Sequence, residues 1–148
     1  MTSRDMAKEL SALVQLDIDA VHAYGQVDEA IGPVEFRNQL LRFRNDHEKH
    51  IEQLSAVLRA LDADPPVREQ DFKGFVLEGF TAIENHLGVE EALLAMKTNE
   101  ELINQRYKEA FIRGFTPRIG ELVAYYYLDE QTHLQFIEKL LAGKSWEK

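Results

Sequence analysis

The chain of 148 residues contains no cysteine, which excludes disulfide bonds, thiolate metal ligands, a cysteine nucleophile and a cysteine-ligated electron-transfer centre within it. Positive charge is also scarce: 17 Lys and Arg against 26 Asp and Glu give a net charge of −9. We therefore expect no binding to nucleic acid or to an anionic membrane. No apolar run reaches the length of a membrane span and the N-terminus lacks the apolar core of a signal peptide, so we expect a cytoplasmic protein.

The four prolines fall at only three places, and the stretches between them carry apolar residues at helical spacing. These breaks predict four long helices, at about 2–31, 34–61, 89–113 and 117–141. The polar stretch from Asp62 to Asp71 contains two consecutive prolines, and a short helix follows at about 72–86. Two helical hairpins joined by a long crossover are one of the known connectivities of a four-helix bundle. We predict an all-α protein with one such domain over residues 1–148.

Ionisable side chains interrupt the apolar face of the last predicted helix. Its stretch Y-Y-Y-L-D-E-Q-T-H-L-Q-F contains Glu130 and His133 in the spacing Glu-x-x-His. At about 100° per residue, three positions return two side chains to the same helical face. Val123 and Ile137 lie on that face too, so a carboxylate and an imidazole are predicted to face the core.

The same arrangement occurs twice, because an offset of 83 positions matches the first hairpin to the second. The matched pairs are Asp17 and Glu100, Tyr24 and Tyr107, Asp46 and Asp129, His47 and Glu130, and His50 and His133. A buried carboxylate or imidazole is costly unless it is paired or bound to a metal. Two interpretations follow for the six predicted site residues: a hydrogen-bonded network, or a site for iron, manganese or zinc between the helices. The six are Asp17, His47, His50, Glu100, Glu130 and His133.

These motifs resemble those of the ferritin-like superfamily of di-iron carboxylate proteins, which includes bacterioferritins and rubrerythrins. Glu100, Glu130, His133 and His50 match its pattern, as do the tyrosines seven residues after the first-helix and third-helix carboxylates. The resemblance implies a di-iron or mononuclear iron site that reacts with O₂ or peroxide, by oxidising ferrous iron or reducing peroxide. It also implies that Glu130 is a bridging ligand. Without cysteine-ligated iron, a peroxidase cycle would need an external electron donor.

Two positions depart from the family pattern. Asp17 stands where a longer Glu is usual, and His47 stands where the family places a second bridging carboxylate. Three carboxylates and three neutral imidazoles leave two divalent ions one negative charge short. His47 therefore also favours a different class of function: a non-catalytic bundle that keeps a structural zinc ion or a polar network and acts by oligomerising or binding a partner. An iron-storage shell ranks third, and a homodimer is expected from base rates.

Three further acidic residues lie near the predicted site in the sequence. Asp46 and Asp129 are expected either to accept an imidazole N–H from a neighbouring helix or to be solvated. Asp19 and His22 are predicted to point away from the site, where they can form a surface pair. Asp19 is the alternative ligand if the register of the first helix is shifted.

Overall fold

The computed structural model describes residues 1–27, 34–69 and 89–144, which form four long helices and no strand. The helices are α1 (Ser3–Val27), α2 (Val34–Ala60), α4 (Val89–Phe111) and α5 (Pro117–Gly143). The predicted all-α class and the four predicted long helices are therefore confirmed. The predicted short helix at about 72–86 and the break at Pro33 between the first two predicted helices lie outside the described residues.

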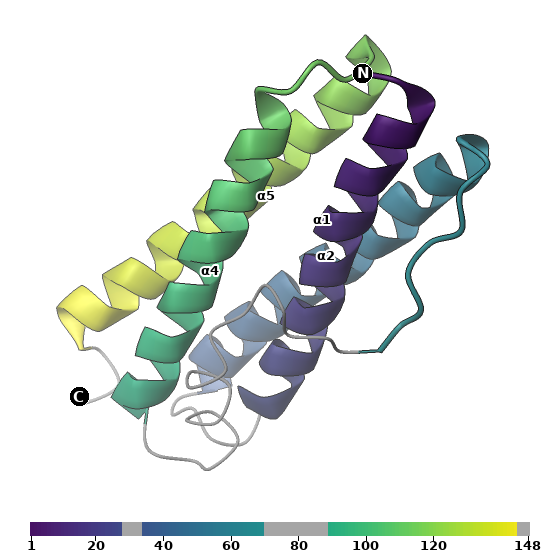
Figure 1. Cartoon of the computed structure of the whole chain (residues 1–148). Coiled ribbons are helices and arrows are strands. Elements are labelled where there is room, and N and C mark those ends of the chain that lie inside the picture. Colours follow the sequence, from purple (N-terminus) through teal and green to yellow (C-terminus); the bar gives the residue numbers. More distant parts are fainter. Residues whose placement is uncertain (28–33, 70–88, 145–148) are drawn as a thin grey trace.

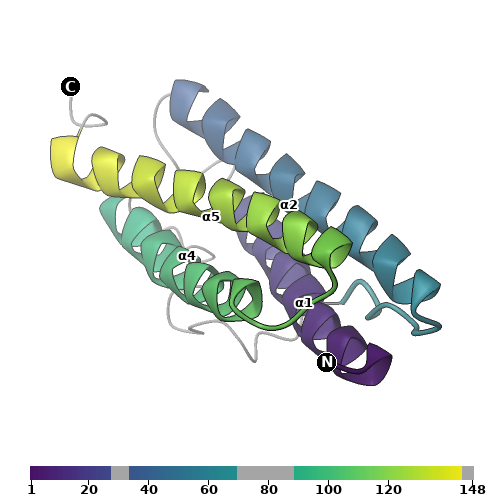
Figure 2. The same cartoon turned by 90° about the horizontal axis from the view of Figure 1, so that it is seen from above.

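The helices form two hairpins that pack against each other. α1 packs mainly on α2, and α4 mainly on α5, with further contacts between α1 and α4 and between α2 and α5. Figure 1 shows that the two helices of each hairpin run in opposite directions, and Figure 2 shows α2 and α5 above α1 and α4. Because α2 ends and α4 begins at opposite ends of the bundle, the connection between the hairpins has to cover the bundle's length (Figure 1).

Local sequence signals explain where the helices begin and end. Before α1, Thr2 and Asp5 form a reciprocal capping box: Asp5 N donates to Thr2 Oγ1 at 3.1 Å and Thr2 N donates to Asp5 Oδ2 at 3.0 Å. After α2, Asp62 adopts a left-handed φ of 60°, and Ala63 N donates to Leu58 O at 2.9 Å, which is a Schellman ending. α5 extends beyond the predicted end at about 141 to include Gly143, and Lys144 takes the left-handed position.

The apolar faces of the helices pack inward as predicted. In α1, however, residues outside the single apolar face are buried as well. Residues 16–20 are all buried, so the prediction that Asp19 lies on the surface is wrong. The chain after α2 contacts this side of α1, where Gln15 Nε2 donates to the carbonyl of Glu69 at 3.0 Å and to Asp19 Oδ1 at 3.1 Å. Phe111 has the spacing of the apolar stripe of the helix predicted at about 89–113, which predicts a core position, but it is 49% exposed. None of the described helices is long and apolar enough to cross a membrane.

Candidate metal centre

The structure brings all six predicted site residues together between the four helices, with each residue at most 1% exposed. α1 contributes one carboxylate and α4 another. α2 and α5 each contribute two side chains three positions apart, which places both on the inward face. The residues are Asp17 from α1, His47 and His50 from α2, Glu100 from α4, and Glu130 and His133 from α5. The alternative ligand Asp19 is buried outside this cluster.

The six residues form two overlapping groups of four that can each hold a metal ion. Within each group one nitrogen or oxygen atom per residue lies within 4.8 Å of the others. His47 and Glu130 belong to both groups, so the two positions are adjacent. The first group adds Asp17 and His50, and the second adds Glu100 and His133.

In the first group, Asp17 contacts both histidines of α2. Its Oδ1 lies 2.6 Å from His47 Nδ1 and 3.1 Å from His50 Nδ1. Glu130 Oε1 lies 3.2 Å from His50 Nδ1 and 3.4 Å from His47 Nδ1. One nitrogen of each imidazole therefore faces both carboxylates.

In the second group, Glu100 Oε1 lies 3.4 Å from His47 Nε2 and 3.6 Å from His133 Nδ1. Glu130 presents its other oxygen here, with Oε2 at 3.3 Å from His133 Nδ1. The two oxygens of Glu130 thus face different groups, as do the two nitrogens of His47.

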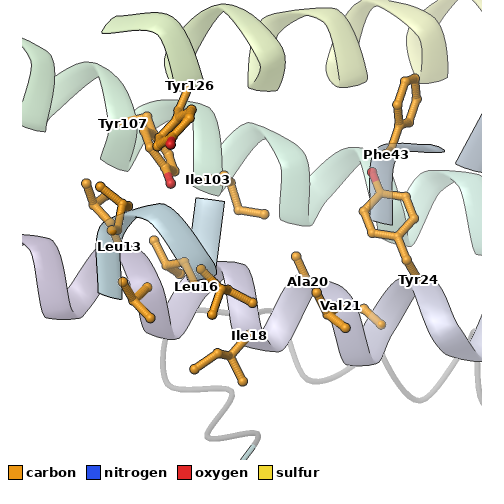
Figure 3. Packing of buried hydrophobic residues seen from close by; sticks show 14 of the residues in the cluster. Leu13, Leu16, Ile18, Ala20, Val21, Tyr24, Phe43, Ile103, Tyr107 and Tyr126 are labelled. Carbon is orange, nitrogen blue, oxygen red and sulfur yellow. The ribbon is translucent and has the colours of Figure 1, made fainter. Parts of the chain in front are cut away.

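Two tyrosines hold the outer carboxylates in place. Tyr24 Oη donates to Glu100 Oε1 at 2.5 Å, and Tyr107 Oη donates to Asp17 Oδ2 at 2.5 Å. Burial and the neighbouring carboxylates raise the pKa of both phenols well above 10, which keeps them protonated as donors. Figure 3 shows Tyr107 beside Tyr126, and Tyr24 beside Phe43 farther along the bundle.

Two aspartates orient the histidines from outside the cluster. His50 Nε2 donates to Asp129 Oδ2 at 2.9 Å, and His133 Nε2 donates to Asp46 Oδ2 at 2.8 Å. These contacts confirm the interpretation that Asp46 and Asp129 each accept an imidazole N–H from a neighbouring helix. With Nε2 directed outward, each of these imidazoles turns Nδ1 toward the cluster, as outer carboxylates do for metal-binding histidines.

Aromatic rings pack against the same two histidines, an arrangement that the spacing of the sequence did not reveal. Tyr126 stacks on His50 with ring centroids 4.1 Å apart, and Phe43 lies against His133 at 4.2 Å. The Tyr126 hydroxyl donates to Gln53. Because Phe43 and Tyr126 occupy matched positions of the repeat, the helical repeat signal could have indicated this pair of ring contacts.

The carboxylates and imidazoles of the cluster shift one another's pKa values. Burial alone would lower the pKa of the three imidazoles, but the carboxylates raise it to about 9 for His47, about 11 for His50 and about 12 for His133. Burial would raise the pKa of the Asp17 and Glu100 carboxyls, but the imidazoles hold both below their usual range. Without a metal, imidazolium groups therefore pair with carboxylates at neutral pH.

This pairing does not satisfy every buried polar atom. Both oxygens of Glu130, Oε2 of Glu100 and Nδ1 of His133 are buried, and no atom of the described residues completes a well-aligned hydrogen bond to them. They lie near one another, yet their geometry is not that of a closed hydrogen-bonded network. Buried carboxylate oxygens and imidazole nitrogens without hydrogen-bond partners are suitable ligands for a cation. The donor set suits iron, manganese or zinc.

Comparison with known proteins identifies the family of the chain. No curated protein and no solved structure matches the sequence. A family model described as a domain of unknown function, DUF2383, matches residues 5–112, which is more than half of the chain. The match includes Asp17, His47, His50 and Glu100 and ends before α5. The chain therefore belongs to the DUF2383 family.

Proposed function

We propose that the protein is a ferritin-like metal-binding protein that holds two divalent ions, with iron as the first candidate. The observation that carries this proposal is the pair of overlapping ligand groups, which share His47 and Glu130. The unsatisfied buried oxygens of Glu130 and Glu100 support it, because a bound cation would supply the direct contact that these atoms lack. Manganese and zinc suit the same donors.

The roles of the side chains follow from which atoms face inward. Asp17 and Glu100 are terminal carboxylates, and His50 and His133 are terminal imidazoles that offer Nδ1. Glu130 offers one oxygen to each group. His47 takes the remaining position in both groups.

Bound iron would supply electron exchange with O₂ or peroxide, and we propose ferrous oxidation or peroxide reduction as the reaction. The residues of the chain hold the ligands and exclude water. Tyr24 and Tyr107 fix the terminal carboxylates, while Asp46 and Asp129 fix the rings of the terminal imidazoles. On becoming ligands, His50 and His133 would each release the proton on Nδ1 and keep the Nε2–H that Asp129 and Asp46 accept. Since the chain has no cysteine, electrons for peroxide reduction come from a separate donor.

The second candidate function is a non-catalytic bundle that acts by oligomerising or binding a partner. The observation that favours it is the matched number of carboxylates and imidazoles, because three imidazolium groups already neutralise three carboxylates. In this case the cluster holds the two hairpins together, with or without a structural zinc ion. The homodimer and the cytoplasmic location stay predictions from the sequence.

The decisive experiment measures the metal content of protein purified without chelator and titrates it with ferrous iron under anaerobic conditions. We expect about two irons per chain, the number of ligand groups, and an absorbance change when O₂ is added. One metal ion or none, without reactivity toward O₂, would favour the non-catalytic bundle.

A matched pair of variants tests the position of the site. Glu130→Ala and Asp19→Ala each remove a fully buried carboxylate, but only Glu130 lies in the ligand groups. We expect Glu130→Ala to lower iron occupancy and Asp19→Ala to leave it at the wild-type value. Equal occupancy in the two variants would show that the metal does not bind in this cluster.

A further inference from the structure

We propose that His47 bridges the two ions of this centre through its ring, with Nδ1 bound to one ion and Nε2 to the other. This inference rests on the proposed function, because it assumes two ions in the two ligand groups. His47 stands where the ferritin-like pattern has a bridging carboxylate, and the proposal gives its imidazole ring that bridging role.

The orientation of the ring is the first observation. His47 Nδ1 lies 2.6 Å from Asp17 Oδ1, in the first group, whereas His47 Nε2 lies 3.4 Å from Glu100 Oε1, in the second. The ring therefore presents one nitrogen to each ion position. An imidazole that served a single ion would direct its other nitrogen to an outer acceptor.

The other two histidines show that contrast. His50 and His133 each donate Nε2–H to an outer aspartate, so only Nδ1 remains for a metal. Among the described residues, the ionic contacts of His47 are all to carboxylates of the cluster itself: Asp17, Glu100 and Glu130. His47 is thus the one histidine of the cluster with both nitrogens directed inward.

Charge provides the second, independent argument. Two divalent ions carry four positive charges, and the cluster offers three carboxylates. If His47 loses both ring protons to solvent as its two metal–nitrogen bonds form, the imidazolate supplies the fourth negative charge. No atom is oxidised or reduced in this step. The deficit noted from the sequence then disappears, although no fourth carboxylate is present.

The third observation concerns the distance between the two ion positions, which share the ligands His47 and Glu130. An imidazolate bridge separates its ions by about 6 Å, given metal–nitrogen bonds of about 2.0–2.1 Å on opposite sides of the ring. Glu130 offers a separate oxygen to each position, since its Oε1 lies 3.2 Å from His50 Nδ1 and its Oε2 lies 3.3 Å from His133 Nδ1. By comparison, the ions of common two-metal sites are about 3.5–4 Å apart.

The test is a crystal structure of the zinc-loaded wild-type protein, with anomalous data at the zinc edge and metal analysis of the same sample. We expect two zinc ions about 6 Å apart, one on each nitrogen of His47. Two ions about 4 Å apart, with a single His47 nitrogen bound, would overturn the bridge and leave the proposed function intact. Fewer than two ions would overturn both.

Substitution provides a second measurement. His47→Glu restores a carboxylate at the position that matches Glu130, and we expect it to keep two zinc ions but to shorten their separation to about 4 Å. His47→Gln offers neither a second nitrogen nor a negative charge, so the occupancy should fall from two ions to one. The control His22→Gln changes a histidine outside the cluster and should keep two ions. Full occupancy in His47→Gln would contradict the bridge.

Discussion

Removing the outer aspartates should weaken metal binding without changing any proposed ligand. Asp129 Oδ2 accepts the Nε2–H of His50 at 2.9 Å, and Asp46 Oδ2 accepts that of His133 at 2.8 Å. Each contact fixes the orientation of a ring and increases the basicity of the nitrogen that faces the cluster. Asp129→Ala removes both effects for His50, whereas Asp129→Asn keeps an acceptor oxygen and loses only the charge.

The size of the effect depends on solvent exposure. Loss of an outer partner typically costs about 10–100-fold in metal affinity, or roughly 1.4–2.7 kcal/mol. The Asp129 side chain is 30% exposed and the Asp46 side chain is 41% exposed, so solvent screens Asp46 more. We therefore expect Asp129→Ala to lower the metal affinity by an amount near the upper end of that range. Asp46→Ala should lower it less than Asp129→Ala does, and Asp129→Asn should lower it by an amount near the lower end.

The assay is a competition titration with a chromophoric zinc chelator, which measures the affinity of each variant. Asp64→Ala is the control, because Asp64 is an exposed acidic residue in the loop after α2. A zinc affinity of Asp129→Ala equal to that of Asp64→Ala would refute the reasoning, since the His50 contact would then have no effect on the ligand. Circular dichroism of each variant shows whether the helices are retained.

Two further expectations concern stability. Without metal, the pKa values of His47, His50 and His133 are raised from 6.5 to about 9, 11 and 12, so their contribution to folding is complete below pH 6.5 and is lost as the pH rises through those values. We expect the Tm of chelator-treated protein to fall between pH 6.5 and 9 and that of zinc-loaded protein to fall less, because ligands bind metal unprotonated; parallel melting curves would contradict this. Leu93→Ala should cost about 2–5 kcal/mol in urea denaturation, because Leu93 is fully buried. The matched control is Leu94→Ala at the neighbouring position, which is 48% exposed, and it should lower the free energy of unfolding by less than about 1 kcal/mol. Equal losses in the two variants would argue against the burial of Leu93 in the core.

Periodicity was sufficient to predict the fold class and the membership of the cluster. A helix returns to the same face every three or four residues, so the spacing of Glu130 and His133 determined their common direction once the segment was helical. The repeat then placed Asp17, Glu100 and His50 at matching depth, because equivalent positions in two similar hairpins lie at similar levels. These inferences needed no knowledge of the packing between hairpins.

Tertiary contacts decided the features that the sequence did not predict. Asp19 is fully buried on the side of α1 where Gln15 contacts both Asp19 and the carbonyl of Glu69, and helical periodicity contains no information on that contact. Phe111 is 49% exposed at the last turn of α4, although its ring centroid lies 6.1 Å from that of Tyr127 on α5, and the spacing of the sequence does not indicate how much of a ring at a helix end its neighbours cover. The ring of His47 faces both groups because neighbouring carboxylates orient it, and residue spacing does not specify the rotation of a ring.

The outer contacts of the cluster all cross from one hairpin to the other. The four contacts are Tyr24 to Glu100, Tyr107 to Asp17, Asp46 to His133 and Asp129 to His50. Neither hairpin alone can therefore position its own ligands, because the group that orients each one belongs to the other hairpin. Packing between the hairpins and metal affinity must be coupled. A metal that binds only this arrangement stabilises the native state by mass action, so the polar cluster joins the hairpins as well as forming the site.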